Sequence, residues 1–148
     1  MKVTVKRSEW RRGIGLNGNA LAKYRPIPRK PTFNLLTGSL PHPEVPPLEY
    51  EFQGRCCLGF ACQQLGGFTD EEMKNVPWPY GMALSEVSPE LDKLFVMHNT
   101  TRAGSKNNSP FAGEAGRIND ATDISEETRE RELTALFNKH GVSLSFVD

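Results

Sequence analysis

The chain has 148 residues and a mass of 16.5 kDa, so we expect residues 1–148 to form a single domain with its own core. No apolar run approaches the roughly 20 residues of a membrane span, and no apolar signal region follows the basic start of the chain. We therefore expect neither membrane insertion nor secretion. Three cysteines, an odd number without paired zinc-ligand spacing, favour reduced thiols, no metal and no other cofactor.

Equal numbers of basic and acidic residues, 18 of each, give a net charge of zero, but the charges are unevenly distributed. Residues 1–30 carry nine Lys or Arg and one acid, Glu9, which leaves nine basic and seventeen acidic residues in the rest of the chain. A basic segment of this kind can bind phosphate groups or can pair with the acidic remainder of the fold. If it binds a ligand, we expect a small anion rather than a long nucleic acid.

The first expected elements are short. Residues 2–7 alternate between valine and polar side chains, which predicts a half-buried strand. Ser8 is a favourable N-cap, so one helical turn is expected over residues 9–12. Two glycines, Gly13 and Gly15, then end that turn.

A proline-rich stretch follows. Seven of the eleven prolines lie between Pro26 and Pro47, and this density disfavours helix and sheet because proline lacks an N–H donor. We expect a long loop insertion over about residues 25–48. Residues 48–53 alternate again and predict a second strand.

The middle of the chain predicts helices. Residues 56–65 carry apolar side chains at helical spacing, and the two glycines that follow them are expected to end this helix. Thr69 and Glu72 form a capping-box pattern, which predicts a short helix that Pro77 ends.

The last third of the chain carries the clearest signals. Ser109 followed by proline predicts the start of one helix, and Ser125 predicts the start of another, with Phe137 and His140 on its buried side. After a terminating glycine, residues 142–146 alternate as a closing strand. The expected fold class is α+β, with a small sheet that includes the N- and C-terminal strands and three or four helices packed against it.

Four segments together resemble a family of small proteins encoded by tailed bacteriophages and prophages. They are Trp10-Arg11-Arg12-Gly13, Cys56-Cys57-Leu58-Gly59-Phe60, Ile118-Asn119-Asp120, and the stretch from Glu130 to Asp148. Residues 20–52 do not match, so the proline-rich stretch resembles an insertion into the family pattern. The resemblance implies a phage origin and action inside an infected bacterium, and it implies no particular activity.

The tandem cysteines are one candidate site. At the first turn of a helix and after Arg55, the thiol of Cys56 or Cys57 would experience a positive potential that lowers its pKa. His98 or His140 would then serve as the base of a Cys-dependent hydrolase. The alternative is core packing, which we favour because unpaired cysteine is among the most buried residue types.

A second candidate site would hold a nucleotide. Trp can stack on a base, Arg can bond a phosphate through its fork, and an Asn-Asp pair can hold a ribose hydroxyl. The ligand-binding candidates are Trp10, Arg11, Arg12, Arg55, Asn119 and Asp120. Each has a structural alternative, namely a core tryptophan, solvated arginines and a helix C-terminal turn, and for the Asn-Asp pair we favour the turn.

These observations predict a non-enzymatic phage accessory protein that acts in the host cytoplasm and interferes with antiviral defence. It would bind and sequester a host factor, and a small nucleotide-type immune signal is the first candidate. Two alternatives stay open. One is a protein–protein antagonist that presents the proline-rich loop to a host defence protein, and the other is a Cys-dependent nucleotide hydrolase. A homo-oligomer is compatible with each of them.

Overall fold

The computed structural model describes residues 1–11, 20–28, 49–98 and 106–148. In chain order the elements are β1 (Lys2–Lys6), the 3-10 helix η1 (Arg7–Glu9), β2 (Ala22–Pro26), β3 (Tyr50–Arg55), α1 (Cys57–Gly66), the 3-10 helix η2 (Pro79–Gly81), α2 (Leu84–Val87), α3 (Pro89–Phe95), β4 (Val96–His98), β5 (Lys106–Asn108), α4 (Pro110–Asp120), α5 (Glu126–Lys139) and β6 (Ser143–Val147). The fold is α+β as expected, with five α-helices within these ranges where three or four were expected.

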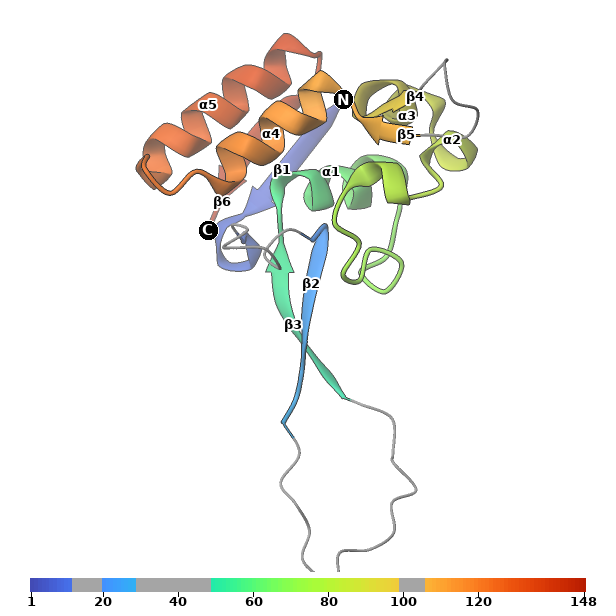
Figure 1. Cartoon of the computed structure of the whole chain (residues 1–148). Helices are drawn as coiled ribbons and strands as arrows, with labels where there is room; N and C mark the ends of the chain where they lie inside the picture. The colour runs from blue at the N-terminus through green and yellow to red at the C-terminus, as the bar shows by residue number, and fades with distance from the viewer. Residues whose placement is uncertain (12–19, 29–48, 99–105) are drawn as a thin grey trace, which may run out of the picture.

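The two ends of the chain share a sheet, as the alternation of their side chains predicts. Strands β1 and β6 pair in parallel, and the register places Val3 beside Leu144. Val3 and Val5 are fully buried and Leu144 is 4% exposed. All three belong to the core that α1, α4 and α5 complete, and Figure 1 shows α4 and α5 lying next to each other over this end of the molecule. The apolar side of each terminal strand therefore faces the helices.

The helix ends follow from the residues that cap them. The Ser109 and Ser125 side chains accept hydrogen bonds from the third residue of α4 and of α5, respectively, as N-caps do. Helix α1 ends at Gly67, whose φ of 71° is the left-handed conformation that glycine adopts most easily. Gly141 has a φ of 77° and turns the chain from α5 into β6. These four positions confirm the predicted boundaries.

Three local expectations are corrected. The helical turn expected at 9–12 is a 3-10 turn that ends at Glu9. The Thr69–Glu72 capping contacts form, but the chain makes turns instead of a helix, because its next residues bond β2 through the pair Asn75 N–H to Ala22 C=O. His140 is exposed at the end of α5, with its ring centroid 4.6 Å from that of Phe111.

Strands β2 and β3 form an antiparallel ribbon that leaves the body of the molecule (Figure 1). We call residues 22–28 and 49–55 the β-arm. The predicted strand at 48–53 is therefore confirmed with a shift, while β2 was not predicted. Of the expected proline-rich loop, residues 29–48 lie outside the described residues, and Pro26 is the last residue of β2.

Candidate functional site

Four residues proposed from the sequence meet around the side chain of a fifth, Asn119, near the end of α4. The Trp10 indole N–H and the Cys57 backbone N–H donate to Asn119 Oδ1, at 2.8 and 3.2 Å. Asn119 Nδ2 donates to the Arg11 carbonyl at 3.1 Å and to Asp120 Oδ1 at 2.8 Å. These bonds use both donors and both lone pairs of an amide that is 1% exposed. Asn119 thus joins three segments of the chain instead of forming the expected helix-end turn.

Trp10 is part of this junction and not a free stacking surface. Its half-buried ring lies with its centroid 4.7 Å from that of Phe146, and its N–H is already bonded. Arg11 is exposed, and its Nε donates to the Gln53 carbonyl. Arg12 lies outside the described residues. Trp10 therefore packs against the core, and Arg11 is exposed while its side chain bonds the backbone of β3.

Arg55 stands at the base of the β-arm and is 7% exposed. Its guanidinium donates to both carboxylate oxygens of Asp70, at 2.7 and 2.5 Å, and to Glu9. The same group lies 4.8 Å from the ring centroid of Phe52. Two carboxylates around one buried arginine compensate its charge. Arg55 therefore links the N-terminal segment, the β-arm and the turn after α1 through these bonds.

The cysteine thiols are arranged for packing. Cys56 is the N-cap of α1 and its Sγ accepts from the Gly59 N–H at 3.4 Å, while burial raises the pKa of its thiol to about 11. Cys57 is fully buried, as the core-packing alternative predicts, and so is Cys62; burial raises the pKa of both thiols. At neutral pH such thiols are protonated and weakly nucleophilic. Of His98 the structure describes only its place in β4, so its predicted role as a base is not tested.

A small cavity adjoins this junction. It lies between the start of α1 and α4 and is lined by residues that include Cys56, Cys57, Trp78, Asn119 and Asp120. Its volume is about 10 Å³, which is room for one water molecule, whereas ligand sites usually measure about 300–1,000 Å³. A nucleotide does not fit this cavity. The nucleotide ligand predicted from the sequence stays a prediction without support from the described geometry.

The sequence carries one further signal beside Arg12. Residues 13–18 read Gly-Ile-Gly-Leu-Asn-Gly, which is the Gly-x-Gly-x-x-Gly pattern of dinucleotide-binding turns. In those turns the pattern leads into a helix whose N-terminus faces the phosphates. Here the next element is β2, and residues 12–19 lie outside the part of the chain that is described. The described residues after the pattern, Ala20 to Pro26, form no helix.

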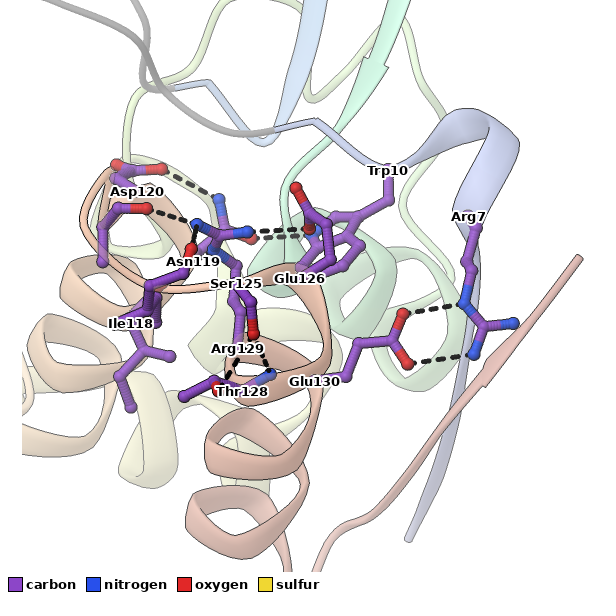
Figure 2. Close-up of polar contacts among 12 residues, drawn as sticks. Arg7, Trp10, Ile118, Asn119, Asp120, Ser125, Glu126, Thr128, Arg129 and Glu130 are labelled. Carbon is purple, nitrogen blue, oxygen red and sulfur yellow. Dashed lines mark hydrogen bonds and ion pairs between the residues drawn. The ribbon is translucent and has the colours of Figure 1, made fainter.

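Sequence reasoning also missed Arg129, which is fully buried in α5. Figure 2 shows its side chain reaching back to the connection between α4 and α5. It donates to the carbonyl oxygens of Ile118 at 3.3 Å, of Ala121, and of Ile124 at 3.4 Å, and it pairs with Glu126 at 2.7 Å. The bonds satisfy carbonyls that the end of α4 leaves free. Because Arg129 is surrounded by glutamates in the sequence, the local pattern does not indicate that its side chain is buried.

The β-arm is the surface feature that stands apart from the body. Its base residues Ala22, Gly54 and Arg55 are buried, whereas Ile27 is 41% and Tyr50 39% exposed farther out. The side chains divide by face, because the register alternates along the two strands. One face carries Tyr24, Pro26, Tyr50 and Phe52, and the other carries Arg25 and Glu51, which form an ion pair at 3.3 Å.

Comparisons with models of protein families, with curated proteins and with solved structures find no match to this chain. In the described ranges no helix is both long and apolar enough to cross a membrane. Among the same residues, no three His, Cys, Asp or Glu side chains come together as metal ligands would. Fold and surface geometry therefore carry the functional inference.

Proposed function

We propose that this protein binds a protein of the infected host cell and that the β-arm is its recognition element. The observation that carries the proposal is the apolar face of the β-arm, which remains exposed beyond the base of the ribbon. Exposed apolar area on an otherwise polar surface is typical of protein-binding sites. An aromatic side chain such as Tyr50 is also the kind of residue that contributes most to binding energy at such sites.

Contacts within the β-arm hold this face in a defined shape. The rings of Tyr24 and Phe52 meet edge to face with centroids 5.4 Å apart. The Lys74 ammonium lies 5.3 Å from the ring centroid of Tyr24 and 4.2 Å from that of Tyr50. One more ladder bond, from the Ile27 N–H to the Glu49 carbonyl at 2.9 Å, extends the pairing past β2. A surface ordered before binding loses less conformational entropy when a partner docks.

The proposed partner is a host defence protein with an apolar groove bordered by polar groups. Such a groove would accept the aromatic face, while the opposite face with its Arg25–Glu51 pair would stay in water. The resemblance to tailed-phage proteins supports an antagonist role in an infected bacterium. The insertion-like position of the proline-rich stretch, between β2 and β3, supports the β-arm as the part specific to this chain.

The test uses site-specific photocrosslinking in infected cells. A benzophenone amino acid replaces Tyr50 on the aromatic face of the β-arm or Lys139 at the end of α5, both of which are exposed. We expect one stoichiometric crosslinked protein from position 50 and none from position 139. The same crosslink pattern from both positions would contradict the proposal.

Affinity for the crosslinked protein is then measured with two matched variants. Tyr50→Glu adds a charge to the aromatic face of the β-arm, where Tyr50 is 39% exposed, and Val87→Glu adds the same charge to a residue of α2 that is 53% exposed. We expect Tyr50→Glu to weaken binding by at least roughly tenfold and Val87→Glu to leave it unchanged. Calorimetric titration of the unmodified chain with a panel of nucleotides addresses the small-ligand alternative, and tight nucleotide binding that Tyr50→Glu does not affect would replace the proposal.

A further inference from the structure

The terminal sheet is unusually small for its type. Parallel sheets are normally larger and covered on both faces, and pairs of strands alone are marginally stable in water. Here β1 and β6 pair in parallel and form a two-stranded sheet. Their apolar sides face the helices, whereas Lys2, Ser143 and Val147 on the opposite face are exposed. A further strand could join this sheet only at one of its two outer edges, that of β1 or that of β6.

The outer edge of β1 is already closed by a side chain. The Gln64 Nε2 donates to the Thr4 carbonyl at 2.6 Å, and the Thr4 N–H donates to Gln64 Oε1 at 2.8 Å. The amide of Gln64 therefore occupies the position of a peptide group in a neighbouring strand. A further strand cannot pair there without displacing it.

Among the described residues, none pairs with the outer edge of β6. The Ser143 N–H donates to the Met1 carbonyl at 2.8 Å, so Ser143 and every second residue after it direct their backbone groups to β1. The backbone groups of Leu144 and Phe146 consequently point away from β1. No hydrogen bond joins these outward groups to any residue in the described parts of the chain. The edge also lacks the proline, lysine or bulge with which proteins usually block such strands.

A groove of about 520 Å³ borders the end of β6 at Phe146 and continues along α5. Two of its charged residues are already paired, since Arg7 bonds Glu130 at 2.7 Å (Figure 2). The other two, Glu127 and Arg131, form no ion pair with any described residue. These two residues lie one turn apart on α5, an acid and a base side by side, so the surface carries both signs and can be complementary to a copy of itself, which is what a two-fold interface requires.

We propose that a second copy of the chain pairs with the outer edge of β6 and forms a two-fold dimer. The two β6 strands run antiparallel, with Ser145 on the axis. Leu144 and Phe146 of each copy then form hydrogen-bonded pairs with Phe146 and Leu144 of the other, so that all the outward groups are used. The product is a continuous four-stranded sheet. This proposal does not depend on the function of the β-arm.

The residue of α5 that lies beside the two-fold axis can be derived from the dimensions of strand and helix. The Val142 N–H donates to the Phe137 carbonyl, which fixes the two elements side by side at that point. Ser145 lies three residues farther, about 10 Å along β6. That distance corresponds to about seven residues of the antiparallel helix α5, which is the level of Glu130. Glu127 and Arg131 therefore lie on opposite sides of the axis, where each faces the opposite charge of the second copy.

Disulfide trapping tests the register. Residues on the axis form a non-hydrogen-bonded pair with their Cα atoms about 4.5 Å apart, which permits a disulfide. We expect Ser145→Cys to form a covalent dimer under mild oxidation on a non-reducing gel, many times faster than Ser143→Cys, whose partner would be Val147. Equal rates for the two variants would show random collisions and overturn the proposal.

Sedimentation equilibrium of the full chain tests the dimer and its charges. We expect twice the chain mass at micromolar concentration, and a dissociation constant raised roughly tenfold by Arg131→Glu. The double variant Glu127→Arg with Arg131→Glu restores complementarity and should recover the dimer. Lys139→Glu, elsewhere on α5, is the control and should have no effect. A monomeric wild-type chain, or a double variant weaker than Arg131→Glu alone, would overturn the proposal.

Discussion

The sheets β1–β6 and β2–β3 both consist of two strands, but their surroundings are opposite. In β1–β6, Val3 and Val5 are fully buried under helices. In the β-arm, burial declines from Ala22 at the base to Ile27, which is 41% exposed. The difference teaches that pairing alone does not assign a role to a strand. The first sheet is held by helices and carries the fold, whereas the second leaves most of its surface to solvent or to a partner.

One buried arginine stabilises each region, Arg129 in the helical body and Arg55 in the β-arm. The two arginines differ in their hydrogen-bond partners. Arg129 bonds mainly backbone carbonyls around the connection between α4 and α5. Arg55 at the base of the β-arm bonds the carboxylates of Glu9 and Asp70. Carbonyl oxygens do not titrate, but carboxylates do. Acid should therefore loosen the β-arm before it loosens the helical body.

Phe137→Ala should produce the largest loss of stability. The ring is fully buried in α5 and meets the Phe111 ring with centroids 5.0 Å apart. Its removal leaves a cavity beneath the terminal sheet, which should lower the free energy of unfolding by roughly 3–5 kcal/mol. Urea denaturation measures the change, and Asn138→Ala, at the exposed neighbouring position, is the control. A loss below about 1 kcal/mol would mean that α5 does not hold the sheet.

Arg129→Met should be the next largest change. Methionine keeps most of the buried volume but leaves the bonded carbonyls at the end of α4 without donors, so we expect a loss of roughly 2–4 kcal/mol. The matched control is Arg117→Met in α4, because Arg117 is 66% exposed and pairs with Glu114 alone among the described residues. Denaturation of the control should shift by less than about 0.5 kcal/mol. Equal losses in the two variants would show that the buried hydrogen bonds of Arg129 do not contribute to the free energy of unfolding.

Asn119→Ala should have an intermediate effect. The indole N–H of Trp10 and the backbone N–H of Cys57 both lose their acceptor, which should cost about 1–3 kcal/mol. The emission of Trp10 should change at the same time, so fluorescence detects the local loss independently of unfolding. Asn107→Ala, at an exposed position of β5, is the control and should change neither quantity.

Local signals predicted much of this fold. N-caps at Ser109 and Ser125 and the glycine after α1 act within a few residues, so the sequence reveals them directly. Ser88 followed by Pro89 is the same signal and marks the start of α3, which could have been predicted. Thr69 shows the limit of such signals, because its capping contacts form while bonds to β2 determine the backbone that follows.

The junction at Asn119 and the role of Arg129 could not be predicted in the same way. Asn119 bonds Trp10, which is 109 residues away in the sequence, and nothing local distinguishes this asparagine from one that ends a helix. Arg129 lies in a segment rich in charge, where an exposed position is the ordinary expectation. The sequence placed several of the junction residues in one candidate site, but only the fold shows that they bond one another.

The ion pairs of Arg55 at the base of the β-arm should weaken in acid. Burial opposes the ionisation of Glu9, but hydrogen bonds from Arg55 and Lys6 outweigh it and lower the pKa of Glu9. A carboxylate with a lowered folded pKa stabilises the fold at neutral pH, and this contribution is lost as pH falls below about 4.3, the ordinary value for glutamate. Denaturation at pH 7 and pH 3.5 should therefore show a larger loss for the wild type than for Glu9→Gln. Identical losses of stability in the two proteins would show that Glu9 does not contribute to the acid response.

Ile27→Glu in the β-arm should have the smallest effect on stability, and it is the counterpart of Phe137→Ala. The side chain of Ile27 is 41% exposed and follows the last residue of β2, so little apolar area returns to water when it is replaced. We expect the free energy of unfolding to change by less than about 0.5 kcal/mol, as at other exposed positions. Urea denaturation measures this change beside that of Val87→Glu, which adds the same charge to an exposed residue of α2. A loss above about 1.5 kcal/mol for Ile27→Glu alone would mean that the outer β-arm packs against the body, and the contrast between the two sheets would then disappear.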